Sequence, residues 1–324
     1  MNVAIIGAGL IGEKRALALP NNYLKVVCDI NGQKATSFAK KFSCKAETDW
    51  KKIIDDKSID AIIISTTNDY LAKIADAAIK KGKHILVEKP GGLNLKELKS
   101  TYEIYKKNPV VILYGYNHRY HPAIQKARDL IETQKFGRTL FIRARYGHGG
   151  RLGYEREWRF QKNKSGGGEL IDQGCHLIDL VNFFCGEMND TSGFVTNLFW
   201  KTKLEDAAFF QLKNKKNQIA DLSVTCIEWK NIFSFEIMLE RAKIQIDGLG
   251  GSYGKEKLTL YLMKPQMGLP DTEEYEFELE DISWKMENNF FLKMITQTDY
   301  NDNSIKEAIY VMSIIEKLYQ KNFI

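Results

Sequence analysis

Asp172 and His176 stand four residues apart in the segment SGGGELIDQGCHLID (Ser165–Asp179). The apolar pattern predicts a helix over Gly168–Phe184, and residues four apart lie on one face of a helix. A carboxylate that holds one ring nitrogen of a histidine fixes its tautomer, so the other nitrogen can take a proton from a hydroxyl near neutral pH. The pair therefore predicts an acid–base site, with a surface or capping pair as the alternative. The glycines Gly166–Gly168 before it would allow close backbone approach.

A glycine pattern suited to phosphate lies near the start of the chain. GAGLIG (Gly7–Gly12) follows the apolar run Val3–Ile6 and precedes a helical segment, Ile11–Leu19. In this context the first glycine allows a tight turn, the second allows a pyrophosphate to approach the backbone, and the third allows helix and strand to pack closely. The phosphates would lie at the helix N-terminus. The predicted cofactor contacts are Gly7, Gly9, Leu10, Ile11 and Gly12.

Asp29 ends the next apolar run, Leu24–Asp29. A carboxylate about twenty residues after the glycines can accept hydrogen bonds from the ribose hydroxyls of a dinucleotide. Ile30, Asn31 and Gly32 follow it, so no arginine is at hand to receive a 2′-phosphate, which the aspartate would repel. We therefore expect NAD rather than NADP. The alternative is that Asp29 caps the following helix, a role that Asn31 could fill equally well.

Short apolar runs alternate with segments of helical period from Asn2 to Tyr114, which is typical of a parallel, doubly wound α/β sheet. The expected strands are Val3–Ile6, Leu24–Asp29, Ala61–Ser65, His84–Val87 and Val110–Tyr114. The expected helices are Ile11–Leu19, Gly32–Phe42, Asp69–Lys81 and Leu95–Lys107. Ligands bind along the carboxyl edge of such a sheet. That edge adds Ser65, Thr66, Asn68, Glu88 and Lys89 to the predicted cofactor contacts.

The composition changes near GYNHRYHP (Gly115–Pro122), which suits an interdomain crossover. We therefore expect an N-terminal doubly wound Rossmann domain over 1–120. A second domain, 121–324, is expected for substrate binding and oligomerisation, with the C-terminal helix able to pack back on the first. Period-two runs predict a C-terminal α+β domain with an open, mainly antiparallel sheet. Its expected strands are Thr139–Tyr146, Thr191–Lys201, Ala207–Leu212, Gln218–Ile227, Phe233–Leu239, Ala242–Asp247, Leu258–Leu262 and Tyr275–Leu279. Its expected helices are His121–Thr133, Gly168–Phe184, Ser283–Ile295 and Asn303–Asn322.

Composition narrows the class of protein. The 324 residues are 44% hydrophobic and 27% charged, which allows two cores. The net charge of +6 comes without basic runs, so nucleic acid is not an expected partner. Five scattered cysteines without a CxxC pair suggest neither a disulfide framework nor a metal site. No apolar stretch reaches the ~18 residues that span a bilayer, and no signal-like segment opens the chain, so we expect a cytoplasmic protein.

VEKPGG (Val87–Gly92) and Ser165–Asp179 resemble motifs of the glucose-fructose oxidoreductase, inositol dehydrogenase and MocA (Gfo/Idh/MocA) family. The resemblance covers essentially the full length and implies hydride transfer between NAD(H) and a secondary alcohol or ketone of a sugar, cyclitol or nucleotide sugar. It implies that Lys89 bonds the reacting oxygen, that His176 is the acid–base residue and that Asp172 orients it. A solvated lysine is the alternative for Lys89. Because Lys89 and His176 come from different predicted domains, the cleft is the expected site.

The chain departs from the family pattern in two places. Tyr70 stands where a histidine is common, and Thr67 replaces a usual proline, which puts details of the NAD contacts in doubt. Asp179 could orient the histidine three residues before it or have a structural role. Two other functions stay open, an NAD-using glycosidase and a non-catalytic cofactor-binding regulator. The joint presence of Lys89, Asp172 and His176 disfavours the regulator.

The segment Arg145–Lys164 is rich in arginine and aromatic residues. Arg151, Arg156 and Arg159 could hold a phosphate or carboxylate of the substrate, which would favour acidic sugars or nucleotide sugars. The alternative is a solvated loop whose charge is balanced by Glu155 and Glu157. Tyr116, Asn117 and Arg119 are further candidate substrate contacts because of their crossover position, and Asp179 is grouped with them.

A sheet of about eight strands has two faces, and the few helices expected in the second domain can cover only one. Phe209, Phe233 or Phe235 would then be exposed unless a second subunit covers them. The sequence therefore predicts a homodimer or a homotetramer.

Overall fold

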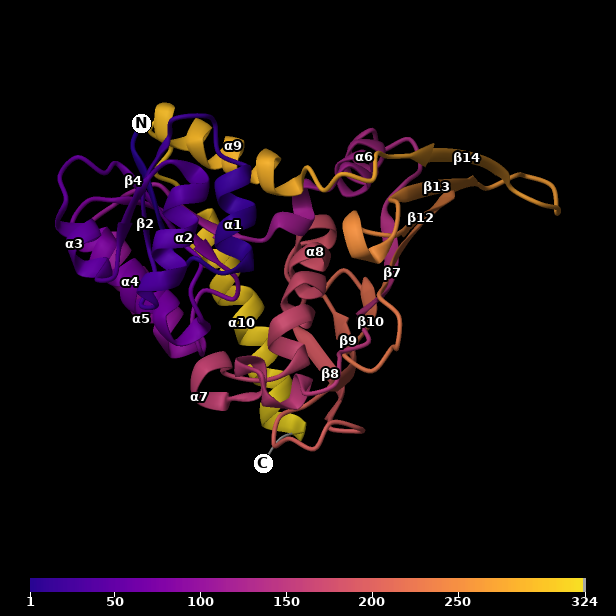
Figure 1. Ribbon diagram of the computed structural model, residues 1–324. Coiled ribbons are helices and arrows are strands. Elements are labelled where there is room, and N and C mark those ends of the chain that lie inside the picture. The colour runs from indigo at the N-terminus through magenta and orange to yellow at the C-terminus, as the bar shows by residue number, and fades with distance from the viewer. Residues whose placement is uncertain (323–324) are drawn as a thin grey trace. The chain divides into compact units, whose positions relative to one another are not determined.

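Two units divide residues 1–322, the part of the chain that the computed structural model describes (Figure 1). The first unit consists of residues 1–116, 163–166 and 284–312, and the second of residues 117–162, 167–283 and 313 onward. Residues 284–312 thus belong to the first unit, although the sequence pattern placed them in the second domain. Phe291, Leu292 and Met294 explain this, because they pack in one hydrophobic core with Val3 and Ile5. Helical periodicity shows which face is buried, but not which core buries it.

The first unit contains a parallel sheet, and its strands within residues 1–322 run in the order β3-β2-β1-β4-β5-β6. They are β1 (Val3–Ile6), β2 (Leu24–Cys28), β3 (Lys45–Glu47), β4 (Ala61–Ile64), β5 (His84–Glu88) and β6 (Ile112–Gly115). The strand order reverses between β1 and β4, and this is the place where doubly wound sheets bind ligands. β1 and β4 are fully buried and uniformly apolar, as expected for a sheet covered on both faces.

The helices of this unit mostly confirm the expected elements. They are α1 (Leu10–Leu17), α2 (Gly32–Phe42), α3 (Trp50–Asp55), α4 (Asn68–Lys80), α5 (Leu95–Lys107), α9 (Ser283–Thr296, from Trp284 on), the start of α10 (Asn303–Asn322) and most of the short α7 (Lys162–Ser165). Three elements, β3, α3 and α7, were not predicted from the sequence. β3 is a polar three-residue strand, and α3 and α7 have six and four residues, so none is long enough to show a period.

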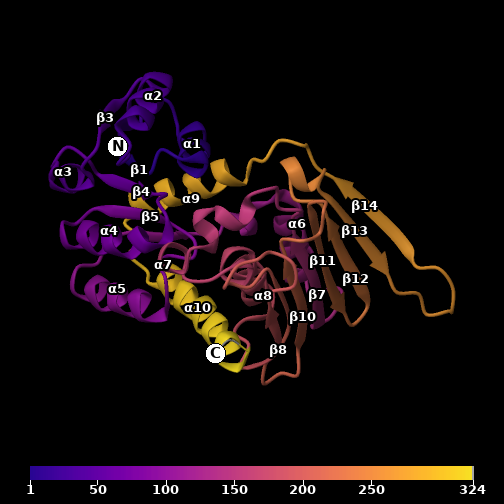
Figure 2. The same cartoon turned by 60° about the horizontal axis from the view of Figure 1, so that its bottom comes forward.

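The second unit contains the open sheet, and its order among the described residues is β14-β13-β12-β11-β7-β10-β9-β8 (Figure 2). Only β7 and β10 pair in parallel there, and the other neighbours are antiparallel. The strands are β7 (Thr139–Gly147), β8 (Asp190–Thr196), β9 (Ala207–Lys213), β10 (Ile219–Thr225), β11 (Ile232–Leu239), β12 (Ala242–Asp247), β13 (Lys257–Leu262) and β14 (Asp271–Glu276). A mainly antiparallel sheet is therefore confirmed.

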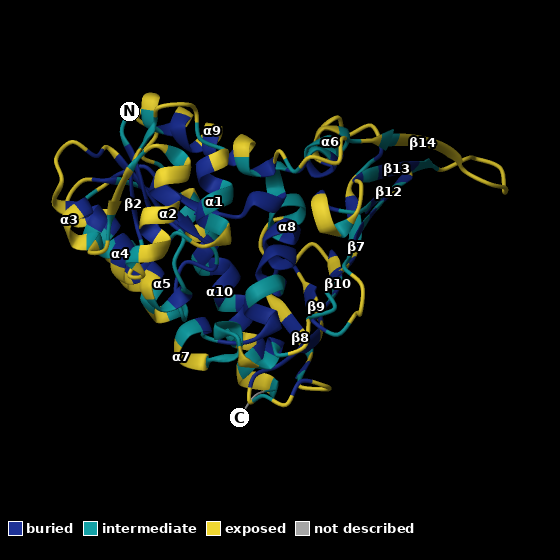
Figure 3. Ribbon diagram, in the orientation of Figure 1, coloured by how far each residue is buried: buried dark blue, intermediate teal, exposed yellow. Residues whose placement is uncertain are grey.

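Two strand predictions in this sheet were displaced. The run expected to extend to Lys201 ends at Thr196, because the backbone N–H groups of Leu198, Phe199 and Trp200 bond the carboxylate of Asp206 in a turn. β14 (Asp271–Glu276) begins before the predicted strand Tyr275–Leu279 and overlaps only its first two residues. It is an acidic, exposed edge strand whose sequence, DTEEYE, carries no apolar alternation. Figure 3 shows the hairpin that ends in β14 as largely exposed.

α8 (Cys175–Cys185) runs along one face of this sheet (Figure 2). It follows a π-helical turn, Leu170–Gly174, so the predicted helix Gly168–Phe184 is not regular throughout. The rest of the helical structure of the unit comprises α6 (Pro122–Glu132), the end of α10 and the 3-10 turns η1 (Asn117–Tyr120), η2 (Tyr154–Arg156), η3 (Trp158–Phe160) and η5 (Gly251–Tyr253).

The predicted exposure of Phe233 and Phe235 was wrong. They are 2% and 0% exposed, and the Phe235 ring lies 5.7 Å from that of Phe184 on α8. Phe209 is exposed as expected, and it pairs in register with the exposed Phe194. Alternation puts these two residues on the face opposite to α8. The sequence showed two faces but not which face α8 covers.

Across residues 1–322, no helix has both the length and the hydropathy needed to cross a membrane.

Candidate active site

The glycine loop of the first unit fits a bound pyrophosphate. Gly7 has φ +110°, and a side chain there would overlap the carbonyl group of Ser65. A side chain at Gly12 would overlap the Gly7 carbonyl, so the helix must approach the loop closely. A Cβ at Gly9 would meet nothing within 4 Å, which leaves open space at the N-terminus of α1. Each glycine thus has the role that a dinucleotide fingerprint requires.

Asp29 connects this loop to the end of β2. Its Oδ2 accepts a hydrogen bond from the Ala8 N–H at 2.9 Å, and its Oδ1 accepts one from the Asn31 N–H at 2.8 Å. Asn31 caps α2, because its side-chain oxygen accepts from Gln33 and Lys34. The cap is therefore not Asp29. A carboxylate oxygen can accept more than one hydrogen bond, so the half-buried Asp29 keeps acceptor capacity for ribose hydroxyls.

The predicted contacts after β4 lie beside the loop. Ser65 donates from Oγ to the Gly7 carbonyl at 3.0 Å. Asn68 is buried and donates from Nδ2 to the carbonyl of Ser165 at 2.8 Å, which commits its amide to an internal bond. Tyr70, which departs from the family pattern, is exposed.

A buried ion cluster lies under the EKP turn. Arg15 is fully buried, donates from Nε to Glu88 Oε1 at 2.7 Å and forms an ion pair from Nη2 to Glu287 Oε2 at 2.6 Å. Its Nη1 donates to Asn288 Oδ1 at 3.0 Å. Burial opposes the charge of Arg15, but the two glutamates outweigh burial and raise the pKa of the guanidinium. The cluster joins α1 to Glu88, the residue that precedes Lys89. Lys89 is half-buried, and its peptide bond to Pro90 is cis.

In the second unit, His176 is buried on α8 and stacks face to face on His118 of η1. The ring centroids are 3.7 Å apart and the planes differ by 16°. The Tyr146 ring meets both imidazoles by an edge, at 5.1 Å from His118 and 6.2 Å from His176. From this stretch the sequence pointed to Tyr116, Asn117 and Arg119, and His118 was missed. His118 is far from His176 in the sequence and contacts it only in the folded structure, so sequence spacing could not identify it.

Asp172 has a partner that sequence spacing did not suggest. Arg159 donates from Nε to Asp172 Oδ2 at 3.0 Å. Burial opposes the charge of Arg159, but Asp172, Tyr154 and Glu157 together outweigh burial and raise the pKa of the guanidinium. The π-helical turn lies between Glu169 and Cys175, so Asp172 and His176 are not related by a regular α-helical spacing. An orienting role of Asp172 toward His176 stays a prediction.

Asp179 is held by an arginine of the crossover. Arg119 donates from Nε and Nη2 to the two carboxylate oxygens of Asp179, at 2.8 and 2.6 Å, and Asp179 is fully buried. This bidentate pair ties η1 to α8. Of the two roles left open for Asp179, this geometry supports the structural one.

The other two loop arginines lie at the surface. The Arg151 side chain is 71% exposed and forms an ion pair with Glu157, and that of Arg156 is 85% exposed and lies 3.4 Å from Glu155. These are the two glutamates of the charge-balanced alternative. Arg151 and Arg156 remain predicted substrate contacts, but only Arg159 reaches a residue of the Asp172–His176 motif.

A second polar cluster consists of His148, Tyr154 and Glu169. His148 Nδ1 accepts from the Gly150 N–H at 3.1 Å, so the proton of the neutral ring is on Nε2, which lies 3.2 Å from Tyr154 Oη and 3.7 Å from Glu169 Oε2. Burial, and then the charges of Glu169 and Asp172, raise the pKa of Tyr154. These residues were not predicted, because they converge only through β7 and the turn at residues 166–170.

Glu205 holds the start of the segment that carries Asp172 and His176. This buried carboxylate accepts from the backbone N–H groups of Gly168 and Leu170, at 2.9 and 3.2 Å, and from Tyr319 Oη at 2.5 Å. Burial raises the pKa of Glu205, against the effect of these donors. A side chain at Gly168 would overlap the Glu205 backbone. The close approach predicted from the glycines is therefore confirmed.

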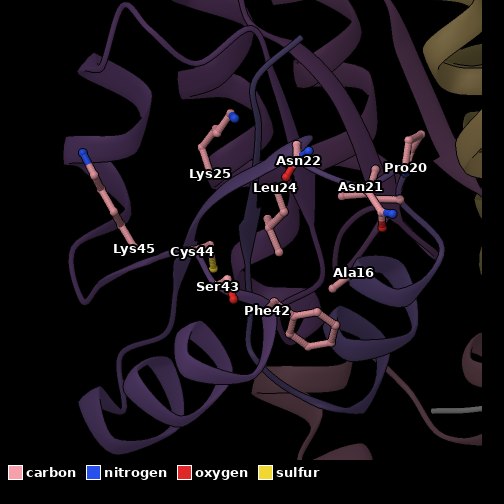
Figure 4. Close-up of a pocket in the computed structure, with 11 residues that line it drawn as sticks. Ala16, Pro20, Asn21, Asn22, Leu24, Lys25, Phe42, Ser43, Cys44 and Lys45 are labelled. Carbon is pink, nitrogen blue, oxygen red and sulfur yellow. The ribbon is translucent and has the colours of Figure 1, made fainter.

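A separate pocket of about 490 Å³ in the first unit lies where β2 and β3 begin (Figure 4). Lys25 and Lys45 line it, and Figure 4 shows their amino groups turned apart. It is at the amino ends of the strands, opposite to the glycine loop, so it does not belong to the cofactor edge.

Comparison with known proteins agrees with this geometry. Residues 1–116 match the oxidoreductase family with an NAD-binding Rossmann fold, and residues 124–245 match the GFO/IDH/MocA C-terminal domain. Levoglucosan dehydrogenase of Pseudarthrobacter phenanthrenivorans is 34% identical over 203 residues, which cover 58% of this chain and 52% of that protein. Glucose-6-phosphate 3-dehydrogenase of Bacillus subtilis is 33% identical over 184 residues, covering 55% and 52%. The matched region thus spans about half the length of these relatives.

The whole fold is also shared with solved structures. A levoglucosan dehydrogenase in complex with NADH superposes with a TM-score of 0.89 over 99% of this chain and 98% of that chain, at 23% identity. The two sheets, the glycine loop and both domain matches lead to one conclusion: the chain belongs to the GFO/IDH/MocA family of oxidoreductases, with an NAD-binding Rossmann domain at its N-terminus.

Proposed function

We propose that the protein is an NAD(H)-dependent oxidoreductase that acts on a secondary alcohol or ketone of a sugar, cyclitol or nucleotide sugar. The observation that supports this proposal is the position of His176. It is buried, it stacks on the His118 ring, and it lies on the same segment as Asp172. A buried imidazole with a fixed ring plane is suited to proton transfer near neutral pH. The glycine loop and Asp29 support NAD as the redox partner.

Each residue has a definite role in the proposed oxidation. NAD⁺, when bound, supplies the hydride acceptor. His176 takes the proton of the hydroxyl group, and the hydride leaves the carbon that bears this group, so the alcohol becomes a ketone. Lys89 bonds the oxygen and stabilises the negative charge that develops on it. Asp172 favours the protonated imidazole electrostatically, and reduction follows the same steps in reverse.

NAD is proposed over NADP for a geometric reason. Asp29 directly follows β2, where the ribose of a dinucleotide would lie, and a 2′-phosphate would bring a dianion against this carboxylate. The protein is further proposed to form a homodimer or homotetramer through the sheet face that bears Phe194 and Phe209.

The test is a substrate screen with the purified protein. Formation of NADH would be followed by fluorescence with NAD⁺ and a panel of levoglucosan, myo-inositol, glucose, glucose 6-phosphate, glucuronate and UDP-N-acetylglucosamine, and consumption of NADH with the corresponding ketones. We expect turnover of at least one sugar or cyclitol with release of NADH. Tight NADH binding without turnover of any compound would support the regulator instead, and sugar cleavage without net NADH release would support the glycosidase.

A further inference from the structure

We propose that His118 is a positioning residue for His176: its ring face sets the plane of the His176 ring, and a chain of hydrogen bonds ending at Asp281 holds His118 itself. The inference rests on the proposed function for the acid–base role of His176. It concerns a residue that neither the sequence motif nor the family match assigns.

The stack restrains both rings. The two imidazoles are 3.7 Å apart at their centroids and 16° from parallel, and both residues are at least nine-tenths buried. His118 is itself wedged on its other sides by ring edges. Tyr146 lies at 5.1 Å, His121 at 5.7 Å and Phe233 at 6.2 Å, all at steep angles. His118 therefore cannot turn without displacing several buried rings, and His176 cannot tilt toward it.

The hydrogen-bond chain has a direction that is set by its end. The carboxylate of Asp281 can only accept, so Ser283 Oγ donates to Asp281 Oδ1 at 2.5 Å. Ser283 Oγ in turn accepts a hydrogen bond from Asn117 Nδ2 at 2.9 Å. The other atom of this amide group, Asn117 Oδ1, lies 3.2 Å from His118 Nδ1. An amide oxygen accepts, so His118 Nδ1 is the donor. The chain thus holds the neutral His118 ring as the Nδ1–H tautomer.

The stack has a chemical consequence for proton transfer. When His176 takes a proton, its imidazolium lies over the face of a neutral aromatic ring, an arrangement that favours the cation. The titratable groups whose rings meet the stack are His121 at the start of α6 and Tyr146 on β7, and Tyr146 in turn has Tyr253, Asp172 and Glu169 as neighbours. His121 is itself held by Glu256, at 2.5 Å, and lies 3.8 Å from Asp281. The His118 face therefore favours the proton on His176.

The experiment compares two replacements of His118. His118→Ala removes the ring face, while His118→Phe keeps a flat ring of similar size and removes the hydrogen bond and the titration. We expect His118→Ala to lower kcat at least tenfold with the KM for NAD unchanged within twofold, and His118→Phe to restore kcat to within threefold of the wild type. His84→Ala removes a histidine at the amino end of β5 and is the control for a general loss of protein stability.

A direct measurement on the ring nitrogens makes the test independent of turnover. Nitrogen-15 NMR of the histidine side chains, with the His176 signals assigned by their loss in His176→Asn, gives the pKa of His176 and the tautomer of His118. We expect the pKa of His176 to fall by at least half a unit in His118→Ala and to recover in His118→Phe. We also expect wild-type His118 to carry its proton on Nδ1 and to lose that preference in Ser283→Ala, which creates almost no cavity.

The outcomes separate this inference from the proposed function. An unchanged His176 pKa in His118→Ala, failure of the phenylalanine variant to recover it, or an Nε2–H tautomer of His118 would each overturn the positioning role. If His118→Ala does not fold, His118→Phe and Ser283→Ala still decide the matter. Retained activity in His176→Asn would instead refute the proposed function, and the NMR results on the stack would stand.

Discussion

Arg159 donates from Nε to Asp172 Oδ2 at 3.0 Å, so this candidate substrate contact is already engaged by a carboxylate. This pair bears on the substrate's charge. A charge-assisted hydrogen bond contributes about 1.5–3 kcal/mol with either partner, so an arginine that leaves Asp172 for a substrate phosphate gains little. It would also leave the largely buried Asp172 unbalanced.

Arg159→Gln is therefore expected to lower kcat for neutral and anionic substrates alike, by about tenfold, because Asp172 loses the cation that holds it. The measurement is kcat and KM for glucose and glucose 6-phosphate, or for another neutral and phosphorylated pair from the screen. Arg138→Gln, at an exposed ion pair with Glu240, should change neither parameter. A tenfold rise in KM confined to the phosphorylated substrate would show that Arg159 holds the anion after all, as the sequence suggested.

His176→Asn preserves approximate size but cannot take a proton near neutral pH. We expect kcat to fall by ~10²–10⁴ with NADH binding intact, because proton transfer loses its acceptor. Lys89→Ala should lower kcat by a similar factor, since it removes the charge aimed at the reacting oxygen. Steady-state kinetics and NADH fluorescence titration would measure both effects. Activity within threefold of the wild type in either variant would remove that residue from the mechanism.

Asp29→Ser tests the choice of cofactor. The wild type should prefer NAD over NADP by at least tenfold in kcat/KM, and the serine variant should narrow this preference because the carboxylate no longer repels a 2′-phosphate. Asn31→Ala is the matched control. It removes the cap of α2 and should cost about 1 kcal/mol of stability without altering the preference. Equal use of both cofactors by the wild type would contradict the assignment.

Arg15→Met probes the buried cluster beneath the EKP turn. Removing the arginine leaves Glu88 and Glu287 buried without their shared cation, and breaking such a pair costs about 3–5 kcal/mol. Urea denaturation would measure the loss. The control, Arg128→Met, breaks an exposed pair with Glu132 and should cost less than about 1 kcal/mol. Similar losses in the two variants would mean that the cluster adds no more than a surface pair.

Phe194 and Phe209 test self-association. They are 74% and 45% exposed on neighbouring strands and border a hollow of about 580 Å³ on the face opposite to α8, with Arg143 and Arg145 beside them. Phe194→Asp combined with Phe209→Asp should convert a dimer or tetramer to smaller species in light scattering, because a charge would replace apolar contact area. Leu152→Asp, at a fully exposed loop residue, should leave the molar mass unchanged. A wild type that is monomeric at micromolar concentration would contradict the prediction.

The sequence by itself determined the features that depend on local backbone chemistry. Gly7 and Gly12 occupy positions where a side chain would overlap the backbone, so their spacing between an apolar run and a helical segment is enough to identify the loop. The apolar runs of β1 and β4 and the alternation of β11 followed from the periods of parallel and antiparallel strands, which are also local. The motif around Asp172 and His176 was recognised in the sequence, but the π-helical turn that contains Asp172 was not.

Only the tertiary structure decided which side chains surround that motif. The stack of His118 on His176 and the pair of Arg159 with Asp172 join residues from different elements, and their packing depends on how η1, the arginine loop and α8 meet. From the sequence alone, Arg15 would be taken for a surface residue of a short helix. In the structure it is buried and forms an ion pair with Glu287 of α9. Phe235 is buried because α8 covers its face of the sheet. Periodicity along one segment specifies a face, whereas the partner of that face comes from a distant part of the chain.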